Sequence, residues 1–176
     1  MTQAYIAVGS NIAPADNVRR AIELLAAKVE LTAVSTVYLT PAEGRPDQDP
    51  YYNCIVAVRT ALPAEQLKAD VLKAIEDRLG RVRTDDRFAP RTIDLDLIVY
   101  DRLEIDSASL KLPDPHILTR AFVAVPLAEV APELVLPRWN VPVSTVAARL
   151  TREQMVPLTA YSRQLQSLVA SGPAER

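Results

Sequence analysis

The sequence predicts an α+β fold, in which helices pack on one face of a mostly antiparallel sheet and C-terminal segments add to this core. Four segments rich in apolar and β-branched residues are typical of strands, and two segments with apolar residues at helical spacing lie among them. Their order along the chain is strand, helix, strand, strand, helix, strand, which matches the βαββαβ pattern of a ferredoxin-like sandwich. The 176 residues are 49% hydrophobic with a net charge of -2, so the chain is long and apolar enough for one domain with a core.

The first half of this pattern covers residues 4–50. AYIAVGS, over residues 4–10, is expected to form the first strand and to end at a glycine. A helix is expected over residues 14–29, where Asp16 precedes apolar residues at helical spacing. LTAVSTVYLT, over residues 31–40, is predicted as one strand, and the proline-rich residues 41–50 as a long loop.

The second half begins with a strand over residues 51–62, YYNCIVAVRTAL. A helix follows from Pro63 to a stop at Gly80, and RTIDLDLIVYD forms the last strand of the pattern. RLEIDS, over residues 102–107, suggests an extra strand, and residues 119–130 a helix that Pro126 interrupts. We expect one domain over residues 1–160 and a C-terminal tail over 161–176, with a short helix and a frayed end.

Composition narrows the classes of function. The near-neutral charge argues against a general nucleic-acid binder. One cysteine, Cys54, and one histidine, His116, exclude an internal disulfide framework and a Cys/His zinc site. The N-terminus lacks the pattern of a signal peptide, and no apolar run approaches the roughly 20 residues of a membrane span. We therefore expect a cytoplasmic protein with no membrane partner and no nucleic-acid partner.

Glycine usage also restricts how a nucleotide could bind. The four glycines form neither the P-loop pattern nor the dinucleotide-binding pattern. Side chains would therefore have to hold the phosphates of any bound nucleotide.

Two aspartates in the last predicted strand are the strongest sign of chemistry. Side chains alternate along a strand, so Asp94 and Asp96 share one face about 6–7 Å apart. The apolar residues Ile93, Leu95, Leu97 and Val99 are expected on the other face. Like charges on one face repel, and a pair of Mg²⁺ ions bridged by both carboxylates would remove that repulsion. The alternative is a solvated outer face of an edge strand.

Four arginines precede this strand, at positions 81, 83, 87 and 91. Guanidinium groups bind phosphate in a bidentate manner, so these residues would suit a metal–polyphosphate ligand. Pro90 and the lack of an amphipathic pattern indicate a loop that can close over a ligand. The alternative is a surface loop in which the arginines pair with Asp85 and Asp86.

Aromatic residues suggest a second ligand. Tyr51 and Asn53 would share one strand face, and a ring beside a carboxamide suits a flat heterocycle. Phe122 follows Arg120 near the start of the predicted C-terminal helix. Each aromatic taken alone would also fit core packing.

Several of these segments occur together in one known family. AYIAVGSNI, YYNCIVAV, RFAPRTIDLDLIVYD and RAFVAVPLAEVAPEL, in this order and spacing, resemble the 6-hydroxymethyl-7,8-dihydropterin pyrophosphokinase family of folate biosynthesis. The resemblance implies a ferredoxin-like enzyme that binds ATP with two Mg²⁺ ions. The hydroxymethyl oxygen of the pterin attacks the β-phosphorus, pyrophosphate is transferred and AMP leaves.

The resemblance also implies site residues. Asp94 and Asp96 would hold both metals, and Arg81 and Arg91 would contact the polyphosphate and assist catalysis. The positions that would contact the nucleotide are Glu76, Arg83, Phe88, Leu97, Lys111 and Arg120. The positions that would bind the pterin are Thr40, Pro41, Ala42, Tyr51, Asn53 and Phe122. The partners would be the two small-molecule substrates, and the protein would be a monomer or a weak homodimer.

Two segments depart from the family pattern. LPDP places Asp114 where the family often has a histidine, and His116 stands two residues later. Glu43 and Gly44 replace an apolar pair found in some relatives. Glu43 and Asp114 motivate one alternative, a relative that acts on a modified pterin. A second alternative, independent of these positions, is a non-catalytic ferredoxin-like module that binds RNA or another anion.

Overall fold

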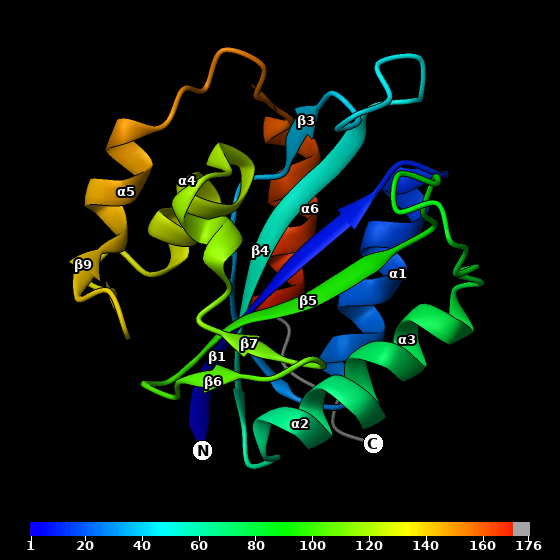
Figure 1. Ribbon diagram of the computed structural model, residues 1–176. Coiled ribbons are helices and arrows are strands. Elements are labelled where there is room, and N and C mark those ends of the chain that lie inside the picture. Colours follow the sequence, from blue (N-terminus) through cyan, green and yellow to red (C-terminus); the bar gives the residue numbers. More distant parts are fainter. Residues whose placement is uncertain (171–176) are drawn as a thin grey trace.

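The computed structural model describes residues 1–170, which form a six-stranded antiparallel sheet flanked by helices (Figure 1). The strand order is β10-β3-β4-β1-β5, and β2 pairs with β4 outside this path. The strands of this sheet are β1 (Thr2–Ser10), β2 (Glu30–Val34), β3 (Tyr38–Thr40), β4 (Tyr51–Thr60), β5 (Asp94–Tyr100) and β10 (Val156–Pro157). The predicted α+β ferredoxin-like fold is confirmed, with β1 and β4 at its centre.

One face of the sheet packs against the helices that the sequence predicted. These are α1 (Pro14–Ala26) and a continuous helical segment made of α2 (Ala64–Gln66), a π-helical stretch η1 (Leu67–Leu72) and α3 (Lys73–Arg78). Ala4, Ile6 and Val8 alternate along β1, and they are buried in the same hydrophobic cluster as the apolar faces of these helices. The helical period of the apolar residues was therefore a sound guide to these two segments.

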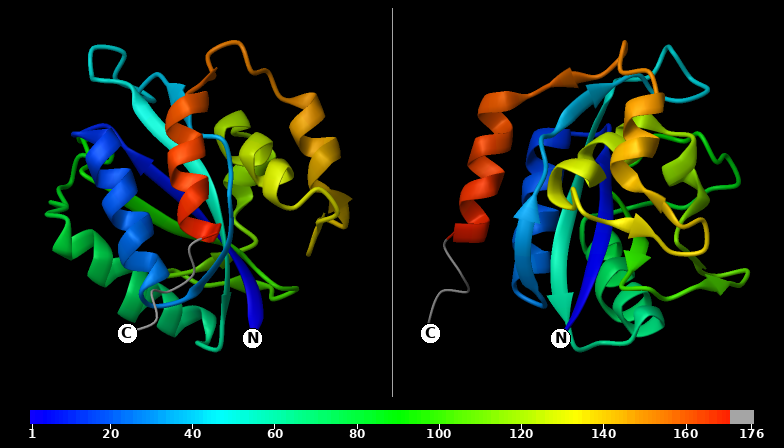
Figure 2. Two further views of the ribbon diagram at one scale, coloured as in Figure 1. Left: turned by 180° about the vertical axis from the view of Figure 1, so that it is seen from behind. Right: turned by 90° about the vertical axis from the view of Figure 1, so that its left-hand side faces the viewer.

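The other face is covered by the C-terminal additions to the βαββαβ core, whose place in the fold the sequence did not specify. Helices α4 (Ala121–Val130) and α5 (Val143–Arg149) form a second cluster with Ile55, Ile98 and Val99. The hairpin of β8 (Val135–Leu136) and β9 (Val141–Pro142) adjoins them. Figure 2 shows α4 and α5 on the side of the sheet opposite α6. Apolar strand residues on both faces require burial, which explains this third layer.

The predicted strand over residues 31–40 is instead two strands. The Ser35 hydroxyl accepts a hydrogen bond from the Ile55 N–H at 2.9 Å, and the Val37 N–H donates to the Ser162 hydroxyl at 2.8 Å. In the segment that joins β2 to β3, these side-chain hydrogen bonds take the place of regular strand pairing with β4. Helix α4 likewise differs from expectation, because it continues through Pro126. Burial of that turn offsets the hydrogen bond that proline cannot donate.

A bulge in β5 changes the predicted alternation of its side chains. Ile6 pairs with Leu97 but the preceding Tyr5 pairs with Val99, so Ile98 is an extra residue. Leu95 and Leu97 lie in the first cluster as expected, whereas Val99 lies in the second. A single inserted residue therefore moved Val99 to the other face.

The C-terminal segment contains the helix that the sequence suggested. Helix α6 (Thr159–Ala170) packs near β2 and buries Leu165, so the boundary expected at residue 160 falls inside this helix. Residues 171–176, part of the frayed end that we expected, lie outside the described residues. A short hairpin of β6 (Ile105–Asp106) and β7 (Lys111–Leu112) includes the extra strand, and η2 (Pro115–Leu118) precedes α4. Within residues 1–170, no helix is long and apolar enough to cross a membrane.

Candidate active site

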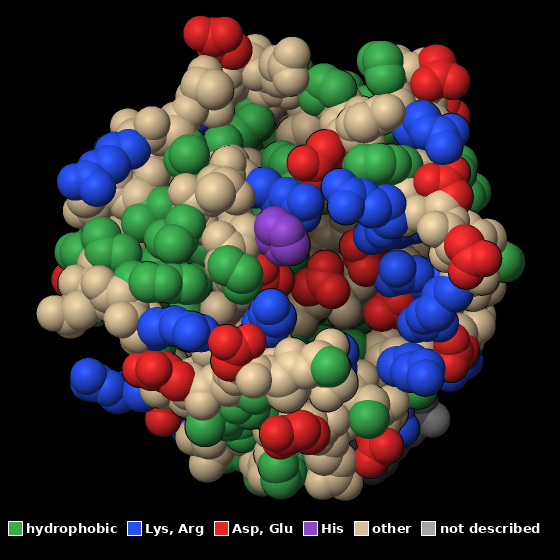
Figure 3. All heavy atoms as spheres, viewed as in Figure 1, with side chains coloured by type: hydrophobic (Ala, Val, Ile, Leu, Met, Phe, Trp, Pro, Cys, Tyr) green, Lys and Arg blue, Asp and Glu red, His purple; other side chains and the backbone are tan. Residues whose placement is uncertain are grey.

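A pocket of about 420 Å³ opens on the face of the sheet that carries α4. Acidic side chains lie at the bottom of this hollow, and basic side chains and the single histidine surround it (Figure 3). The pocket is lined by β1, β4 and β5, by the β3–β4 loop (residues 41–50), by the arginine loop (residues 80–91) and by η2 and α4.

Small residues of β1 form the floor of the pocket. Gly9 pairs with Asn53 on one side and with Asp94 on the other, and Ala7 pairs with Asp96. A Cβ atom at Gly9 would lie 2.9 Å from the Asn53 side-chain oxygen, so a larger residue would displace that amide. The alternation of large and small residues in β1 thus fills the core on one face and leaves space on the other.

Asp94 lies between two arginines at one end of the pocket. Its Oδ1 atom is 2.6 Å from Arg81 Nη1 and its Oδ2 atom is 2.5 Å from Arg91 Nη1. Arg81 also pairs with Glu76, a largely buried carboxylate of α3. Burial raises the pKa of Glu76, an effect that Arg81 opposes. These residues form what we call the charged end of the pocket.

Asp96 is the carboxylate at the charged end that lacks such compensation. Among residues 1–170 it makes no ion pair and accepts no hydrogen bond. The Asp96 side chain is exposed to solvent at the mouth of the pocket, although many protein atoms lie around it and reduce its hydration. This desolvation, followed by the charges of Asp94 and Asp114, raises the pKa of Asp96 to about 7.

The two carboxylates fit a divalent cation. An uncompensated carboxylate next to a second one, both facing a pocket, is stabilised when a dication binds. Across residues 1–170, no cluster of three or more His, Cys, Asp or Glu side chains forms a closed metal site. Mg²⁺ often uses one or two carboxylates and completes its shell with water and substrate phosphates, so two aspartates are sufficient ligands for it.

The part of the pocket that lies across Gly9 from Asp94, which we call the ring end, consists of neutral groups. Tyr51, Asn53, Thr40 and Phe122 line it, and the Asn53 amide donates a hydrogen bond to the Thr40 hydroxyl at 2.8 Å. Burial raises the pKa of Tyr51, so this phenol is uncharged at neutral pH. Two rings and a fixed carboxamide can hold a flat heterocycle with several hydrogen-bonding edges.

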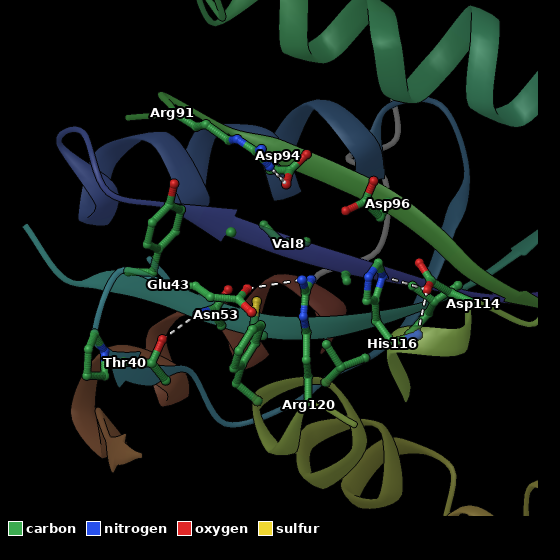
Figure 4. Close-up of a pocket in the computed structure, with 18 of the residues that line it drawn as sticks. Val8, Thr40, Glu43, Asn53, Arg91, Asp94, Asp96, Asp114, His116 and Arg120 are labelled. Atoms are coloured by element: carbon green, nitrogen blue, oxygen red, sulfur yellow. Dashed lines mark hydrogen bonds and ion pairs between the residues drawn. The ribbon is translucent and has the colours of Figure 1, made fainter. Parts of the chain in front are cut away.

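One ion pair crosses the mouth between these ends, and a local contact between two neighbouring residues lies beside it (Figure 4). The Glu43 carboxylate of the β3–β4 loop lies 3.0 Å from Arg120, which precedes α4. His116 Nδ1 lies 2.9 Å from Asp114 Oδ1, and the same oxygen accepts the His116 backbone N–H. Both positions at which the sequence departs from the family pattern therefore contribute to the rim of the pocket.

The structure brings most of the predicted site residues into this pocket. Those that line it are Thr40, Pro41, Tyr51, Asn53, Phe88, Arg91, Asp94, Asp96, Arg120 and Phe122. Arg81 and Arg83 line a smaller hollow of about 70 Å³ beside it, which Arg91 shares. Glu76 lies behind both hollows as the partner of Arg81 and Arg83.

Three predicted residues lie elsewhere. The Leu97 side chain is buried in the first cluster because it alternates with Asp96, and Ala42 is buried outside the lining. Lys111 is exposed on β7 and pairs with Asp106. The acid partners suggested for the arginine loop also differ, since Asp86 pairs with Arg45 and Arg83 pairs with Asp77.

Sequence reasoning missed the floor of the pocket and one residue of its wall. Gly9 and Ala7 were assigned to a strand without a role, although small residues alternating with large ones in AYIAVG are a usable signal. Gln48 of the β3–β4 loop lines the pocket as well. No local pattern distinguishes it from its polar neighbours.

Fold and site together define an α+β protein of the ferredoxin-like class, with one pocket that combines paired carboxylates, arginines and aromatic rings. Comparison with known sequences then specifies the family. Residues 5–132 match the 7,8-dihydro-6-hydroxymethylpterin-pyrophosphokinase (HPPK) family, and the chain belongs to it.

Individual relatives agree with this assignment. The chain is 43% identical over 139 residues to the 2-amino-4-hydroxy-6-hydroxymethyldihydropteridine pyrophosphokinase of Methylorubrum extorquens, covering 77% of this chain and 87% of that protein. It is 40% identical over 135 residues to the Bacillus subtilis protein of the same name, covering 74% and 79%. Among solved structures, wild-type HPPK-DHPS of Plasmodium falciparum with pteroate matches with a TM-score of 0.67 at 13% identity. That match covers 84% of this chain and 42% of the solved chain, and it supports the fold alone.

Proposed function

We propose that this protein transfers pyrophosphate from ATP to the hydroxymethyl group of 6-hydroxymethyl-7,8-dihydropterin and releases AMP, a step of folate biosynthesis. Family membership supports the reaction. The main structural support for this reaction is one pocket that contains both kinds of group. Two neighbouring carboxylates of β5 face a ring end lined by Tyr51 and Phe122. One end suits a metal-bound polyphosphate and the other suits a flat heterocycle.

Asp94 and Asp96 are the residues that would hold Mg²⁺, and we propose two ions. Bound there, the metal supplies charge stabilisation for the phosphates and lowers the pKa of a coordinated hydroxyl. Asp96 is available as a ligand because nothing in residues 1–170 pairs with it. Asp94 is already oriented by two arginines, which keeps its carboxylate directed at the pocket.

The arginines would bind the polyphosphate. A guanidinium group has five N–H donors, and Arg81 uses one nitrogen, Nη1, for both Glu76 and Asp94. Its other donors, with the N–H groups of Arg91 that neither Asp94 nor the Arg87 carbonyl engages, would bind phosphate oxygens at the edge of the two hollows. Such donors stabilise charge that develops during phosphoryl transfer. Glu76 keeps the Arg81 side chain in place, so its role is positioning.

The remaining nucleotide contacts would come from the rim. Arg83 lies in the smaller hollow, Phe88 offers a ring from the arginine loop, and Arg120 faces the pocket from the start of α4. The pterin would stack between Tyr51 and Phe122. Asn53 and Thr40 would bind its hydrogen-bonding edge, with Pro41 beside them.

A coupled assay for AMP tests the proposal directly. Purified protein with ATP, Mg²⁺ and 6-hydroxymethyl-7,8-dihydropterin should form AMP and the pyrophosphorylated pterin in equal amounts. The double variant Asp94→Ala with Asp96→Ala should lose turnover but still bind the pterin. Folded wild-type protein that forms no AMP would refute the activity. Salt-dependent oligonucleotide binding without Mg²⁺ would instead support the non-catalytic module.

A second candidate is activity on a modified pterin. The observation in its favour is the pair of rim contacts that involve Glu43 and Asp114, the two departures from the family pattern. Measuring kcat/KM for a series of pterins with different side chains distinguishes the candidates. A clear preference for a substituted pterin would favour the second, and a preference for the hydroxymethyl compound the first.

A further inference from the structure

Arg87, in the arginine loop, is a charged residue to which the proposed chemistry assigns no role of its own. Its side chain is exposed, and it lines both the main pocket and the smaller hollow beside it. An arginine at the boundary of the two hollows can reach an anionic ligand in either of them. Whether it is free to do so depends on the partners that its guanidinium already has.

Arg87 differs from its neighbours in having no carboxylate partner. The other arginines that line the two hollows each pair with a carboxylate, and they are Arg81, Arg83, Arg91 and Arg120. Within residues 1–170, the Arg87 side chain forms no ion pair and donates no hydrogen bond. Because this guanidinium is exposed, water solvates it and the missing partner costs little. A phosphate group can therefore contact Arg87 without first displacing a carboxylate.

An aromatic ring holds this unpaired guanidinium in place. The Arg87 guanidinium carbon lies 4.6 Å from the centre of the Phe88 ring, which is a cation–π distance. The ring itself rests against Gly44, where a Cβ atom would lie 2.7 Å from a ring carbon. A ring is a much weaker acceptor than a phosphate oxygen, so the N–H donors of Arg87 remain available to an anion.

The backbone of Arg87 is also tied to the charged end of the pocket. Its carbonyl accepts a hydrogen bond from Arg91 Nη2 at 2.8 Å, while Arg91 Nη1 pairs with Asp94. Arg87 therefore stands one residue outward from the arginine that reaches the carboxylates. A ligand that enters from solvent can meet the exposed Arg87 before it meets the half-buried Arg91.

The surrounding charges give an unpaired arginine a use at this place. The chain has a net charge of -2, and acidic side chains lie at the bottom of the main pocket (Figure 3). A nucleotide with its phosphates is also negative, so the average field of the protein does not attract it. A cation at the rim whose charge no contact offsets attracts the phosphates within about 10 Å, the screening length at 0.1 M salt.

We propose that Arg87 is the capture residue for the polyphosphate of the nucleotide, an inference that rests on the proposed function. Arg87 makes the first contact with a phosphate group at the rim, where the two hollows meet. The paired arginines Arg81 and Arg91 engage the phosphates afterwards. Arg87 therefore sets the rate at which nucleotide associates, and it contributes little to the rate at which the final complex dissociates.

Stopped-flow binding of a fluorescent, non-hydrolysable ATP analogue with Mg²⁺ tests this role. Arg87→Gln should lower the association rate constant about three- to fivefold at low salt, because one unit charge near the phosphates is lost. The dissociation rate constant should change less than about twofold. The difference from wild type should nearly vanish at high salt, where the charge of Arg87 is screened.

Two matched variants separate capture from other effects. Arg87→Lys keeps the charge but loses the planar fork of donors, so it should keep most of the association rate constant. Arg20→Gln makes the same change in net charge at an exposed arginine of α1, which packs on the face of the sheet opposite the pocket. Arg20 makes no ion pair within residues 1–170, and its loss should leave both rate constants within about 1.5-fold of wild type.

Each outcome decides a separate claim. Wild-type protein that binds the analogue but forms no AMP would refute the proposed reaction, and the rate constants would still judge Arg87. An association rate constant that Arg87→Gln leaves unchanged, or that Arg20→Gln lowers equally, would overturn the capture role. A faster dissociation as the main effect of Arg87→Gln would also overturn it, since Arg87 would then act in the bound complex. Wild-type protein that does not bind the analogue would overturn both claims.

Discussion

The two ends of the pocket are built on the same sheet, but they differ in whether their residues are charged and paired before a ligand binds. At the charged end, Arg81 and Arg91 already pair with carboxylates of the chain, as Arg120 does at the mouth. At the ring end, Tyr51 and Asn53 are uncharged and need no counter-ion. A ligand at the charged end must therefore exchange ion pairs, whereas a ligand at the ring end enters a largely preformed site.

The difference has an electrostatic cause. Unpaired like charges in a partly desolvated pocket are costly, so the protein pairs arginines with acids until a polyphosphate and its metals arrive. Asp96 is the exception, and its raised pKa records that cost. Rings and amides carry no such penalty. Changes at the two ends should therefore produce different kinetic signatures.

Asp94→Asn should produce the largest effect, because it removes charge that the metal and two arginines share. We expect kcat/KM to fall by at least about 10³-fold, since charge stabilisation of this kind contributes several kcal/mol. Pterin affinity should change little. Steady-state assays of AMP formation and direct pterin titration measure both. Asp106→Asn, at an exposed carboxylate remote from the pocket, is the control and should keep full activity.

Tyr51→Ala should affect the other end. Loss of one stacking ring should weaken pterin binding by about 10- to 100-fold, from roughly 1–3 kcal/mol of stacking. Nucleotide affinity should stay within about twofold, since no arginine pair is altered. Tyr51→Phe keeps the ring and should retain most of the affinity. Equal weakening of both substrates in Tyr51→Ala would contradict the division of the pocket.

Glu43→Gln should have a smaller effect, in the opposite direction. It releases Arg120 from an ion pair at the rim, so a phosphate group no longer competes with a carboxylate. The pair is partly exposed, and such pairs contribute less than about 1 kcal/mol, so we expect a two- to fivefold gain in affinity for the Mg²⁺-bound ATP analogue. Calorimetric titration measures the gain. Weaker nucleotide binding would show that Glu43 supports the ligand.

The last effect concerns stability without metal rather than substrate binding. The pKa of Asp96 is about 7 in the folded protein and near the ordinary value of 3.8 when unfolded. Between these values the folded state binds more protons, so the contribution of Asp96 makes stability fall as pH rises from about 4 to about 7. The Asp96→Asn variant has no carboxyl group to titrate there, so it does not lose this stability. With EDTA present, the urea midpoint of the variant minus that of wild type should increase as pH rises over this range and stay constant above it.

Parallel urea profiles of wild type and Asp96→Asn across that pH range would contradict the assigned pKa. Restoring excess Mg²⁺ provides the control, because only the wild-type carboxylate can benefit fully from the metal.

Local patterns identified the elements whose burial is regular. The apolar spacing of α1 and of the segment Ala64–Arg78 specified their helices, and the alternation in β5 placed Asp94 and Asp96 on one face. Patterns failed where long-range contacts override them. The Ser162 hydroxyl from α6 binds the Val37 N–H where the predicted strand breaks, and Pro126 is tolerated in α4 because that turn is buried.

The site, like the fold, was predictable where it depends on residue type and unpredictable where it depends on long-range packing. Residue type alone indicated carboxylates for metal, arginines for phosphate and rings for a heterocycle, because these preferences belong to the functional groups. Tertiary packing determines which residues reach the pocket. Leu97 points into the core because side chains alternate along β5, and Lys111 lies on a separate hairpin.

The sequence by itself determined the α+β class, the family and the chemical character of both ends of the pocket, because each depends on residue types at short spacing. Only the tertiary structure decided which charges pair. The contacts of Glu43 with Arg120 and of Asn11 with Gln48 and Arg91 join residues far apart in the chain. Such contacts depend on how the loops meet above the sheet, and no local pattern encodes that meeting.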